Sequence, residues 1–409
     1  MGWGDVGVHG ATDVPTPNLD AIAAEGVRFA NGYVSGPQCS PARAGLLTGR
    51  YQERFGHEFN LGPHAAGFGL PLDETTLADR MKAAGYATGL VGKWHLGLAP
   101  QVHPLRRGFD EFFGFLAGTH PYLPGREPLL RGIESVAQTE HLTDAIAREA
   151  IAFVARHRAR PFFLLVAFNA VHGPPEPDPA LLARFGAIAD PKRRAYVATL
   201  AGMDLAIGRL VAALRDARIL DETLLVFLSD NGGWTMPGNS QNGASNAPFR
   251  GSKRTLLEGG IRVPFFVRWP ARLPKGAVFA PPVIQLDLVP TVLAAAGIPA
   301  PPAARLDGVD LLAHLAAGGT KLSPPHEALY WRFGRQMAIR RGDWKLVRYD
   351  RAVEGGSGLS DARLYDLARD PGEWTDLAAE HPDVVRGLRD AWDRWNAANA
   401  RARWRAAPH

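Results

Sequence analysis

The residues with the clearest capacity for chemistry lie in one short stretch that contains the only cysteine of the sequence, Cys39. Pro41 suits the first turn of a helix, where a missing N–H costs no hydrogen bond, and Gly49 can end that helix in a left-handed conformation. We therefore predict a helix that begins just after Cys39, so that its N-terminus favours negative charge beside the thiol. Arg43 follows about one helical turn later and can point toward the same place. A lone cysteine is otherwise most often a small buried apolar residue.

Two lysines and a histidine are further candidates for a charged site. Lys93 and His95 follow residues 86–91, a predicted strand, and side chains two residues apart in an extended chain point the same way. Lys253 lies in a polar loop, in the sequence Arg-Gly-Ser-Lys. Each of these residues also has an ordinary interpretation, as a solvated surface lysine or as a histidine whose hydrogen bonds are satisfied in the core.

Polar residues also follow two apolar runs that are typical of buried strands. His172 comes after the run 161–168, which has the profile of a central parallel strand, and Asp230 and Asn231 come after the run 223–228. Carboxylate and amide oxygens are ligands for hard cations, although Asp and Asn before glycine are also typical of a tight turn. A single histidine at a strand end is by itself unremarkable.

The stretch from Cys39 to Arg50, C-S-P-A-R-A-G-L-L-T-G-R, resembles the signature of the type I sulfatases. In that family the cysteine is oxidised after translation to formylglycine, whose hydrated aldehyde is the nucleophile. The spacing to the proline and the arginine identifies Cys39, rather than Ser40, as the residue that matches. Four more elements match in the family's order: G-K-W-H-L-G at 92–97, H-G-P at 172–174, D-N-G at 230–232 and the segment 250–264. The match covers residues 1 to about 270, and the rest resembles the family more loosely.

The resemblance implies a role for each candidate. The implied catalytic residues are Cys39, Arg43, Lys93, His95, His172 and Lys253, and the implied ligands of one calcium ion are residue 39, Asp230 and Asn231. On this hypothesis Asp230 takes the proton of one formylglycine hydroxyl, which attacks sulfur, while His172 and Lys253 assist the departing alcohol. His95 then takes the proton of the second hydroxyl, and sulfate is expelled from the sulfate ester on residue 39.

The start of the sequence bears on calcium binding. Sulfatases open with an apolar strand that ends in two calcium-binding aspartates, directly before a segment like Gly2-Trp3-Gly4-Asp5. The present sequence starts at Met1, after the position of that strand. Asp230, Asn231 and residue 39 are few ligands for an ion that takes six to eight oxygens. We therefore expect a chain that begins at Met1 to bind calcium weakly.

Composition narrows the class of protein. The chain has 409 residues and a formal net charge of +5, with no basic run of the kind that binds nucleic acid. One cysteine excludes an intramolecular disulfide. No apolar run approaches the roughly 20 residues of a membrane span, so we expect none. No signal peptide is evident, and the resemblance alone suggests a periplasmic or secreted location.

The elements that must position these residues alternate between strands and helices. This order favours a mostly parallel, doubly wound α/β sheet flanked by helices, in which ligands gather beyond the carboxyl ends of the strands. A Pro-, Gly- and Ala-rich stretch at 297–325 interrupts the pattern. Short antiparallel strands and a helix at 383–400 follow it. We predict a catalytic domain at 1–318 and a small C-terminal α+β subdomain at 319–409.

These observations favour a sulfuric ester hydrolase that acts on carbohydrate or aryl sulfates. Its expected partners are a sulfated small molecule or glycan as substrate and a formylglycine-generating enzyme. One alternative is a phosphonate or phosphate monoester hydrolase of the same superfold, since phosphate and sulfate esters share a shape. Another is a truncated, inactive relative that only binds sulfated ligands.

Overall fold

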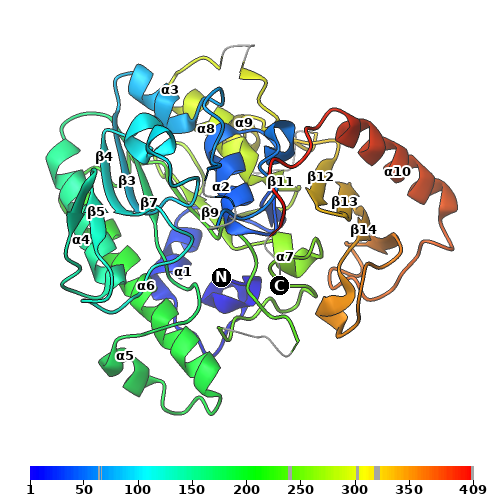
Figure 1. Ribbon diagram of the computed structural model, residues 1–409, viewed down its shortest axis with the longest axis horizontal. Helices are drawn as coiled ribbons and strands as arrows, with labels where there is room; N and C mark the ends of the chain where they lie inside the picture. Colours follow the sequence, from blue (N-terminus) through cyan, green and yellow to red (C-terminus); the bar gives the residue numbers. More distant parts are fainter. Residues whose placement is uncertain (63–64, 66, 238–241, 301–303, 317–322, 407–409) are drawn as a thin grey trace.

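The computed structural model of the chain describes residues 1–62, 65, 67–237, 242–300, 304–316 and 323–406. Within these ranges the strands form one five-stranded sheet, two four-stranded sheets and a two-stranded pair. Figure 1 shows the five-stranded sheet on the left of the molecule, with helices on both sides, and the C-terminal sheet on the right under helix α10.

The five-stranded sheet has the order β6-β5-β4-β3-β7. Its strands are β3 (Ala87–Lys93), β4 (Glu111–Phe115), β5 (Leu129–Arg131), β6 (Glu134–Val136) and β7 (Phe162–Ala167). Strand β3 pairs in parallel with both β4 and β7, whereas β5 and β6 extend the sheet in antiparallel fashion. The carboxyl ends of β3 and β7 therefore lie at the same edge of the sheet.

Helices cover both faces of this sheet because successive side chains of a strand point to opposite faces. Leu90 packs with residues of α2 (Cys39–Thr48) and α3 (Leu77–Ala83), whereas Val91 packs with residues of α4 (Leu142–His157). The predicted α/β class, with parallel strands flanked by helices, is confirmed. The remaining helices of this part are α1 (Pro17–Ala24), α5 (Pro179–Arg184), α6 (Pro191–Asp216), α7 (Glu258–Ile261), α8 (Leu288–Ala295) and α9 (Leu312–Ala316).

A second sheet lies in the part of the chain before the C-terminal subdomain and has the order β10-β1-β9-β8. Its strands are β1 (Val27–Phe29), β8 (Leu225–Leu228), β9 (Phe265–Arg268) and β10 (Ala277–Phe279). The short strands β2 (Gly32–Tyr33) and β11 (Val283–Ile284) pair beside it in parallel. Strand β8 runs antiparallel to β9, and its carboxyl end leads into Asp230.

Strands β7 and β8 differ from the prediction that both are buried. Each stands at the end of its sheet, and the side chains of residues 162–166 and 225–228 are partly exposed. The prediction was wrong here because an apolar run records the composition of a strand and not the number of its neighbours. An apolar strand with a single hydrogen-bonded neighbour keeps one edge open.

Helix α2 follows the prediction with a small shift. It begins at Cys39 itself, with Gln38 as the preceding cap residue, so Cys39 lies in the first turn rather than before it. Gly49 ends the helix with φ +68°, and its N–H donates to the carbonyl of Gly45 at 2.8 Å. The predicted C-terminus is therefore confirmed.

Helix α6 is long and apolar enough, by length and composition, to cross a membrane, whereas the sequence led us to expect no such run. Of its most apolar window, 56% is buried inside the protein. The helix packs against α1, α4 and α5. This environment is that of a core helix.

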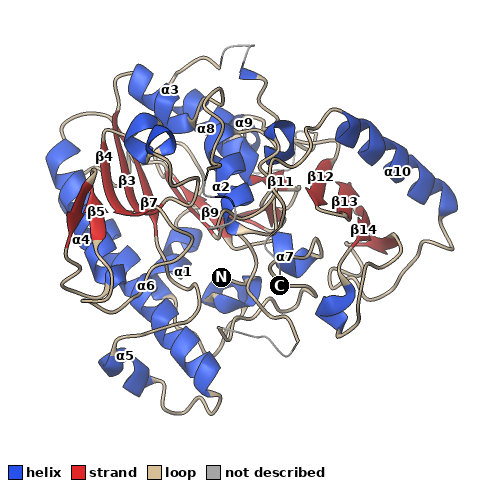
Figure 2. Ribbon diagram, in the orientation of Figure 1, coloured by secondary structure: helices blue, strands red, loops and turns tan. Residues whose placement is uncertain are grey.

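The C-terminal subdomain is an antiparallel sheet covered by one helix, as predicted (Figure 2). Its elements are β12 (Leu329–Phe333), β13 (Gln336–Arg341), β14 (Trp344–Arg348), β15 (Arg363–Asp366) and α10 (Pro382–Ala397). The indole N–H of Trp331 donates to the carbonyl of Val34 at 2.7 Å and so joins this sheet to the N-terminal part of the chain. The expected boundary at 318/319 lies outside the described residues.

Candidate active site

Three predicted residues meet at the first turn of α2. The Cys39 side chain is buried, and its Sγ lies 3.3 Å from Nζ of Lys253. Nζ of Lys253 also lies 3.5 Å from Nε2 of His172. These residues come from a helix N-terminus, the loop before α7 and the loop after β7. The structure thus brings together side chains that are far apart in sequence.

Lys93 and Asp230 add an ion pair at the ends of β3 and β8. Lys93 Nζ lies 4.0 Å from Asp230 Oδ2, and the carboxylate is 29% exposed while the lysine is buried. Burial lowers the pKa of the Lys93 ammonium, and the neighbouring Cys39 and Asp230 oppose that change. Burial disfavours the Asp230 carboxylate, but Lys93, Arg43 and Lys253 outweigh it and hold the pKa of Asp230 below its ordinary value. Asp230 is therefore an anion among cations.

Arg43 is the third cation close to Cys39 and Asp230, after Lys93 and Lys253. Its guanidinium is buried, Nε donates to the carbonyl of Trp94 at 2.8 Å, and Nη2 donates to the carbonyl of Lys93. The side chain therefore ties α2 to the end of β3. Its charge still acts on Cys39 and Asp230, since both favour the charged form of Arg43.

His95 is oriented differently from the sequence expectation. That expectation assumed an extended chain from Lys93 to His95, but β3 ends at Lys93 and His95 has the left-handed φ of +59°. The ring Nε2 lies 3.1 Å from the carbonyl oxygen of Leu61. Burial, followed by the charge of Lys93, holds the pKa of His95 well below its ordinary value. Its Nδ1 is buried and has no hydrogen-bond partner in the described part of the chain.

His172 is a neutral imidazole of defined tautomer. Its Nδ1 lies 2.8 Å from the carbonyl oxygen of Gly173, which can only accept, so Nδ1 carries the hydrogen. Nε2 is then left as the acceptor that faces the Lys253 ammonium. Burial, followed by the charge of Lys253, lowers the pKa of His172 to about 3. In this pair Lys253 is the residue that holds a proton to give.

A buried serine and histidine support the site and were missed as functional candidates. Ser40 Oγ donates to the carbonyl of His95 at 2.7 Å and lies 2.7 Å from Nε2 of His57. The N–H of Ser40 donates to the side chain of Asn60 at 2.9 Å. Ser40 thus fixes the turn beside Cys39 against the segment of His95. The signal was present, because Ser40 lies within the cysteine motif.

Asp230 and Asn231 fit calcium in ligand type but not in number. Asn231 Nδ2 donates to the carbonyl of Gly232 at 2.8 Å, while its Oδ1 is buried without a hydrogen-bond partner among the described residues. An orphaned amide oxygen beside a carboxylate suits a hard cation. In the ranges that the structure describes, no three His, Cys, Asp or Glu side chains cluster as metal ligands. The two residues supply two oxygen donors.

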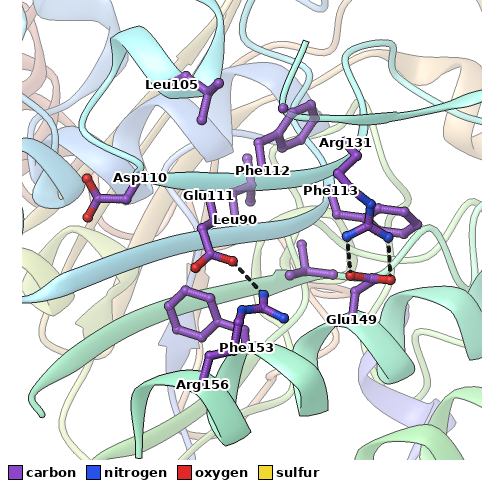
Figure 3. A pocket seen from close by; sticks show the side chains of 12 residues that line it. Leu90, Leu105, Asp110, Glu111, Phe112, Phe113, Arg131, Glu149, Phe153 and Arg156 are labelled. Carbon is purple, nitrogen blue, oxygen red and sulfur yellow. Dashed lines mark hydrogen bonds and ion pairs between the residues drawn. The ribbon is translucent and has the colours of Figure 1, made fainter. Parts of the chain in front are cut away.

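A separate pocket of about 330 Å³ lies between α4 and strands β3 to β5, and its lining contains none of the candidate residues. Figure 3 shows that Arg131 faces Glu149 and that Arg156 faces Glu111, whereas Asp110 points away from both pairs. Asp110 pairs instead with Lys82 at 2.7 Å. Arg131 contacts both carboxylate oxygens of Glu149, at 2.7 and 2.6 Å, and Arg156 contacts Glu111 at 2.5 Å. Since these charges are already paired, the pocket offers no free group for chemistry.

Comparison with known proteins places the chain in a family. Residues 1–298 match the family model described as Sulfatase, and residues 251–394 match that of the N-sulphoglucosamine sulphohydrolase C-terminal region. An N-acetylgalactosamine-6-sulfatase from Sus scrofa is 38% identical, over 95% of this chain and 82% of the relative. The crystal structure of Ps i-CgsB in complex with k-i-k-neocarrahexaose has a TM-score of 0.92 and 33% identity, over 99% of this chain and 92% of that one.

The phosphonate hydrolase alternative rests on fold alone. The phosphonate monoester hydrolase of Agrobacterium radiobacter has a TM-score of 0.67 and 23% identity, over 97% of this chain and 94% of that one. The family match, by contrast, covers most of the chain and includes the segments that carry Cys39, Lys93, His172, Asp230 and Lys253. The chain therefore belongs to the sulfatase family and is a sulfuric ester hydrolase.

Proposed function

We propose that the chain hydrolyses a sulfate ester carried by a carbohydrate, with residue 39 as the nucleophile. The observation that carries the proposal is the meeting of Cys39 and His172 on the ammonium of Lys253, at 3.3 and 3.5 Å. The carbohydrate class is supported by the similar Sus scrofa enzyme, named for N-acetylgalactosamine, and by the similar structure that binds a carrahexaose.

The charges of the site suit an anionic ester. A sulfate ester is negative and repels an anionic nucleophile, so cations must gather around the sulfuryl oxygens first. Arg43, Lys93 and Lys253 supply three positive charges against the single carboxylate of Asp230. The dipole of α2 adds to this field, because a helix N-terminus favours negative charge.

We propose further that Cys39 is converted to formylglycine by a formylglycine-generating enzyme, which must supply a two-electron oxidant. The Cβ is oxidised to the aldehyde, whose oxygen comes from water, and the sulfur leaves as sulfide. The hydrated form of that group supplies two hydroxyls on one carbon, one to attack sulfur and one whose proton is lost when sulfate departs. Over one turnover an S–O bond is broken, one ester and one water are consumed, and one alcohol and one sulfate are released.

The neighbouring residues then have distinct proton tasks. Lys253 gives a proton to the departing alcohol oxygen, while the neutral Nε2 of His172 accepts a hydrogen bond from Lys253 and holds its ammonium in place. Asp230 is ionised before the reaction and takes the proton of the attacking hydroxyl. His95, whose buried Nδ1 is free to accept, takes the proton that is released with sulfate.

We also propose that Asp230 and Asn231 contribute oxygen ligands to one calcium ion, whose charge would add to that of the cations on the sulfuryl oxygens. Calorimetric titration of the 409-residue chain with calcium tests this without an activity assay. We expect weak binding that Asn231→Ala removes. Asn31→Ala, a change at a partly exposed amide that bonds to Ala280 and Arg340, should leave the binding unchanged. Tight binding, or binding that survives Asn231→Ala, would contradict the proposed ligand set.

The test of the nucleophile is the variant Cys39→Ser. A serine has a hydroxyl to accept the sulfuryl group but no second hydroxyl to expel it, so we expect at most one turnover per molecule. Wild-type protein co-expressed with the generating enzyme is assayed in parallel, with intact-mass measurement of residue 39, and Cys39→Ala gives the background. Steady-state hydrolysis by Cys39→Ser would refute the proposed route. Comparing turnover of an aryl sulfate and an aryl phosphate tests the choice of ester.

A further inference from the structure

The loop of residues 250–262 carries Lys253 into the site and is held from behind by the C-terminal subdomain. On its inner side the N–H of Lys253 donates to the carbonyl of Gly233 at 3.0 Å, and the N–H of Gly232 donates to the carbonyl of Gly260 at 3.0 Å. These bonds join the 250–262 loop to the segment after Asp230. Its outer side contacts β13 to β15 and the turns that follow them.

Arg250 makes the first of these outer contacts. Its guanidinium carbon lies over three aromatic rings of the C-terminal subdomain, those of Tyr349, Tyr365 and Trp374, at 5.3, 5.7 and 5.2 Å from the ring centroids. Nη2 donates to the Tyr365 hydroxyl at 3.0 Å and to the carbonyl of Glu373, and Nη1 contacts the Glu354 carboxylate at 2.5 Å. Such stacking and charge-assisted bonds anchor one end of the loop.

Glu258 fixes the other end of the loop. Its carboxylate lies 2.8 Å from Nζ of Lys345 on β14, and its backbone N–H donates to the Glu373 carboxylate at 2.6 Å. Lys345 lies 2.8 Å from Glu373 as well, and all three side chains are fully buried. Breaking a buried charge pair leaves an uncompensated charge, so this group resists displacement.

Gln336 of β13 holds the middle of the loop through its backbone. Its Oε1 accepts from the N–H of Leu256 at 3.2 Å, and its Nε2 donates to the carbonyl of Arg254 at 2.8 Å. Lys253 therefore lies between Arg250, which is anchored in the subdomain, and the backbone of residues 254–256, which Gln336 holds. Moving either anchor moves the ammonium relative to Cys39.

We propose that Arg250 is a positioning residue for Lys253: its anchorage in the aromatic and carboxylate groups of the C-terminal subdomain keeps the Lys253 ammonium within reach of the leaving oxygen. The inference rests on the proposed role of Lys253 as proton donor. A shift of about 1 Å in a reacting group can cost 100-fold in rate. Arg250 contacts the C-terminal subdomain and not the reacting groups. Its loss should nevertheless slow the proton transfer from Lys253 to the leaving oxygen.

A misplaced proton donor has a recognisable kinetic signature. An aryl sulfate with an acidic phenol departs without help, whereas one with a weakly acidic phenol needs a proton in the transition state. Loss of the donor therefore slows poor leaving groups more than good ones and steepens the dependence of kcat/KM on the acidity of the phenol. A general loss of folded protein lowers all rates by the same factor.

The experiment measures kcat/KM for a series of aryl sulfates, from nitrophenyl to phenyl sulfate, with formylglycine-containing full-length protein. We expect Lys253→Ala to lose about 100-fold more on phenyl than on nitrophenyl sulfate, and Arg250→Gln about 10-fold more. The double variant should have the slope of Lys253→Ala alone, because both changes remove one interaction. Arg250→Lys, which keeps the charge over the rings, should restore part of the slope.

Arg332→Gln is the matched control. Arg332 is as buried as Arg250, with side-chain exposures of 13% and 11%, and it also pairs with a carboxylate across the two parts of the chain, that of Glu58 at 2.9 Å. Among the described residues its side chain bonds to Glu58, to Asn396 and to the carbonyl of Ala400, and not to the 250–262 loop. Arg332→Gln should lower the free energy of unfolding, while the dependence of kcat/KM on the acidity of the phenol stays that of the wild type.

Hydrogen exchange gives a second readout that does not depend on turnover. Amides of residues 251–257 should exchange faster in Arg250→Gln than in the wild type, and not in Arg332→Gln. If Lys253→Ala leaves the dependence of kcat/KM on phenol acidity unchanged, Lys253 is not the proton donor, and the positioning role of Arg250 is then refuted as well. If Lys253→Ala steepens the slope but Arg250→Gln changes neither slope nor exchange, the donor role stands and the positioning role is overturned.

Discussion

At the scale of single residues, burial decides which groups carry charge. His57, His95 and His172 are buried, and burial lowers the pKa of each, so these rings are neutral at the pH at which the cations around Cys39 are charged. One buried carboxyl group shows the opposite consequence of the same cause. Burial raises the pKa of Glu53 to about 8, and the neighbouring Glu58 adds to this effect.

The raised pKa of Glu53 predicts a specific pH dependence of the free energy of unfolding. The folded chain keeps the Glu53 proton up to about pH 8, whereas the unfolded chain loses it near the ordinary pKa of 4.5. The contribution of protonated Glu53 to the free energy of unfolding is therefore fully present below pH 4.5. It is lost as pH rises toward 8, by at most about 1.4 kcal/mol per pH unit. Glu53→Gln should flatten this part of the profile, so that the variant gains on the wild type between pH 5 and 8 in urea unfolding.

The exposed Glu327 provides the control for this change, because its replacement by Gln removes the same formal charge from a side chain that is 83% exposed. Glu327→Gln should keep the wild-type slope. An unchanged slope in Glu53→Gln would show that another group dominates the titration of the folded state.

At the scale of elements, the site depends on how closely β3 approaches its neighbour. Gly92 has φ +113°, and a Cβ at this position would lie 2.0 Å from the carbonyl oxygen of Ala167 on β7. Only glycine allows this backbone conformation together with this approach. Lys93 and His95 follow directly, so the strand pairing sets their positions.

Gly92→Ala should therefore lower both stability and activity. Left-handed strain costs about 1–2 kcal/mol and forced overpacking about 1–3 kcal/mol more, so we expect a loss of about 3 kcal/mol in the free energy of unfolding. Gly85→Ala is the matched control, since Gly85 has φ +87° with no atom within 4 Å of the added Cβ. It should lose only the strain component and keep the wild-type kcat. Equal losses in the two variants would show that the contact with β7 is unimportant.

At the scale of the whole molecule, the two parts of the chain share one hydrophobic core. The cluster that contains Trp331, Leu346 and Trp392 of the C-terminal subdomain also contains Tyr33 and Leu256 of the catalytic part. Together with the buried Lys345 group, this core makes the subdomain a structural support of the 250–262 loop. Separate unfolding would expose apolar surface on both sides of the interface.

We therefore expect one cooperative unfolding transition for the full chain. Calorimetry and the loss of activity should report the same midpoint, and Trp331→Phe, which removes the bond to the carbonyl of Val34, should shift both midpoints together. Trp344→Phe is the control, because the Trp344 ring is partly exposed and contacts only the tilted ring of His381, 5.0 Å away within the subdomain, among the aromatic pairs of the described residues. Two resolved transitions would contradict the shared core.

Much of the site could be predicted because its motifs are local. The start of α2 close to Cys39, its end at Gly49 and the strand before Lys93 follow from short-range preferences for caps, turns and apolar runs, although the exact first residue of α2 was not predicted. The edge positions of β7 and β8 could not be predicted in this way. The number of neighbours of a strand depends on segments elsewhere in the chain.

The sequence by itself determined the family, the α/β class and the residue types that carry the chemistry, since each is written in contiguous stretches of a few residues. Only the tertiary structure decided that Lys253 reaches Cys39 across 214 positions, that His172 is neutral and faces that lysine, and that Arg250 is anchored in the C-terminal subdomain. The physical reason is that burial, charge pairing and ring stacking depend on which distant segments pack together, and no local pattern of residues specifies those partners.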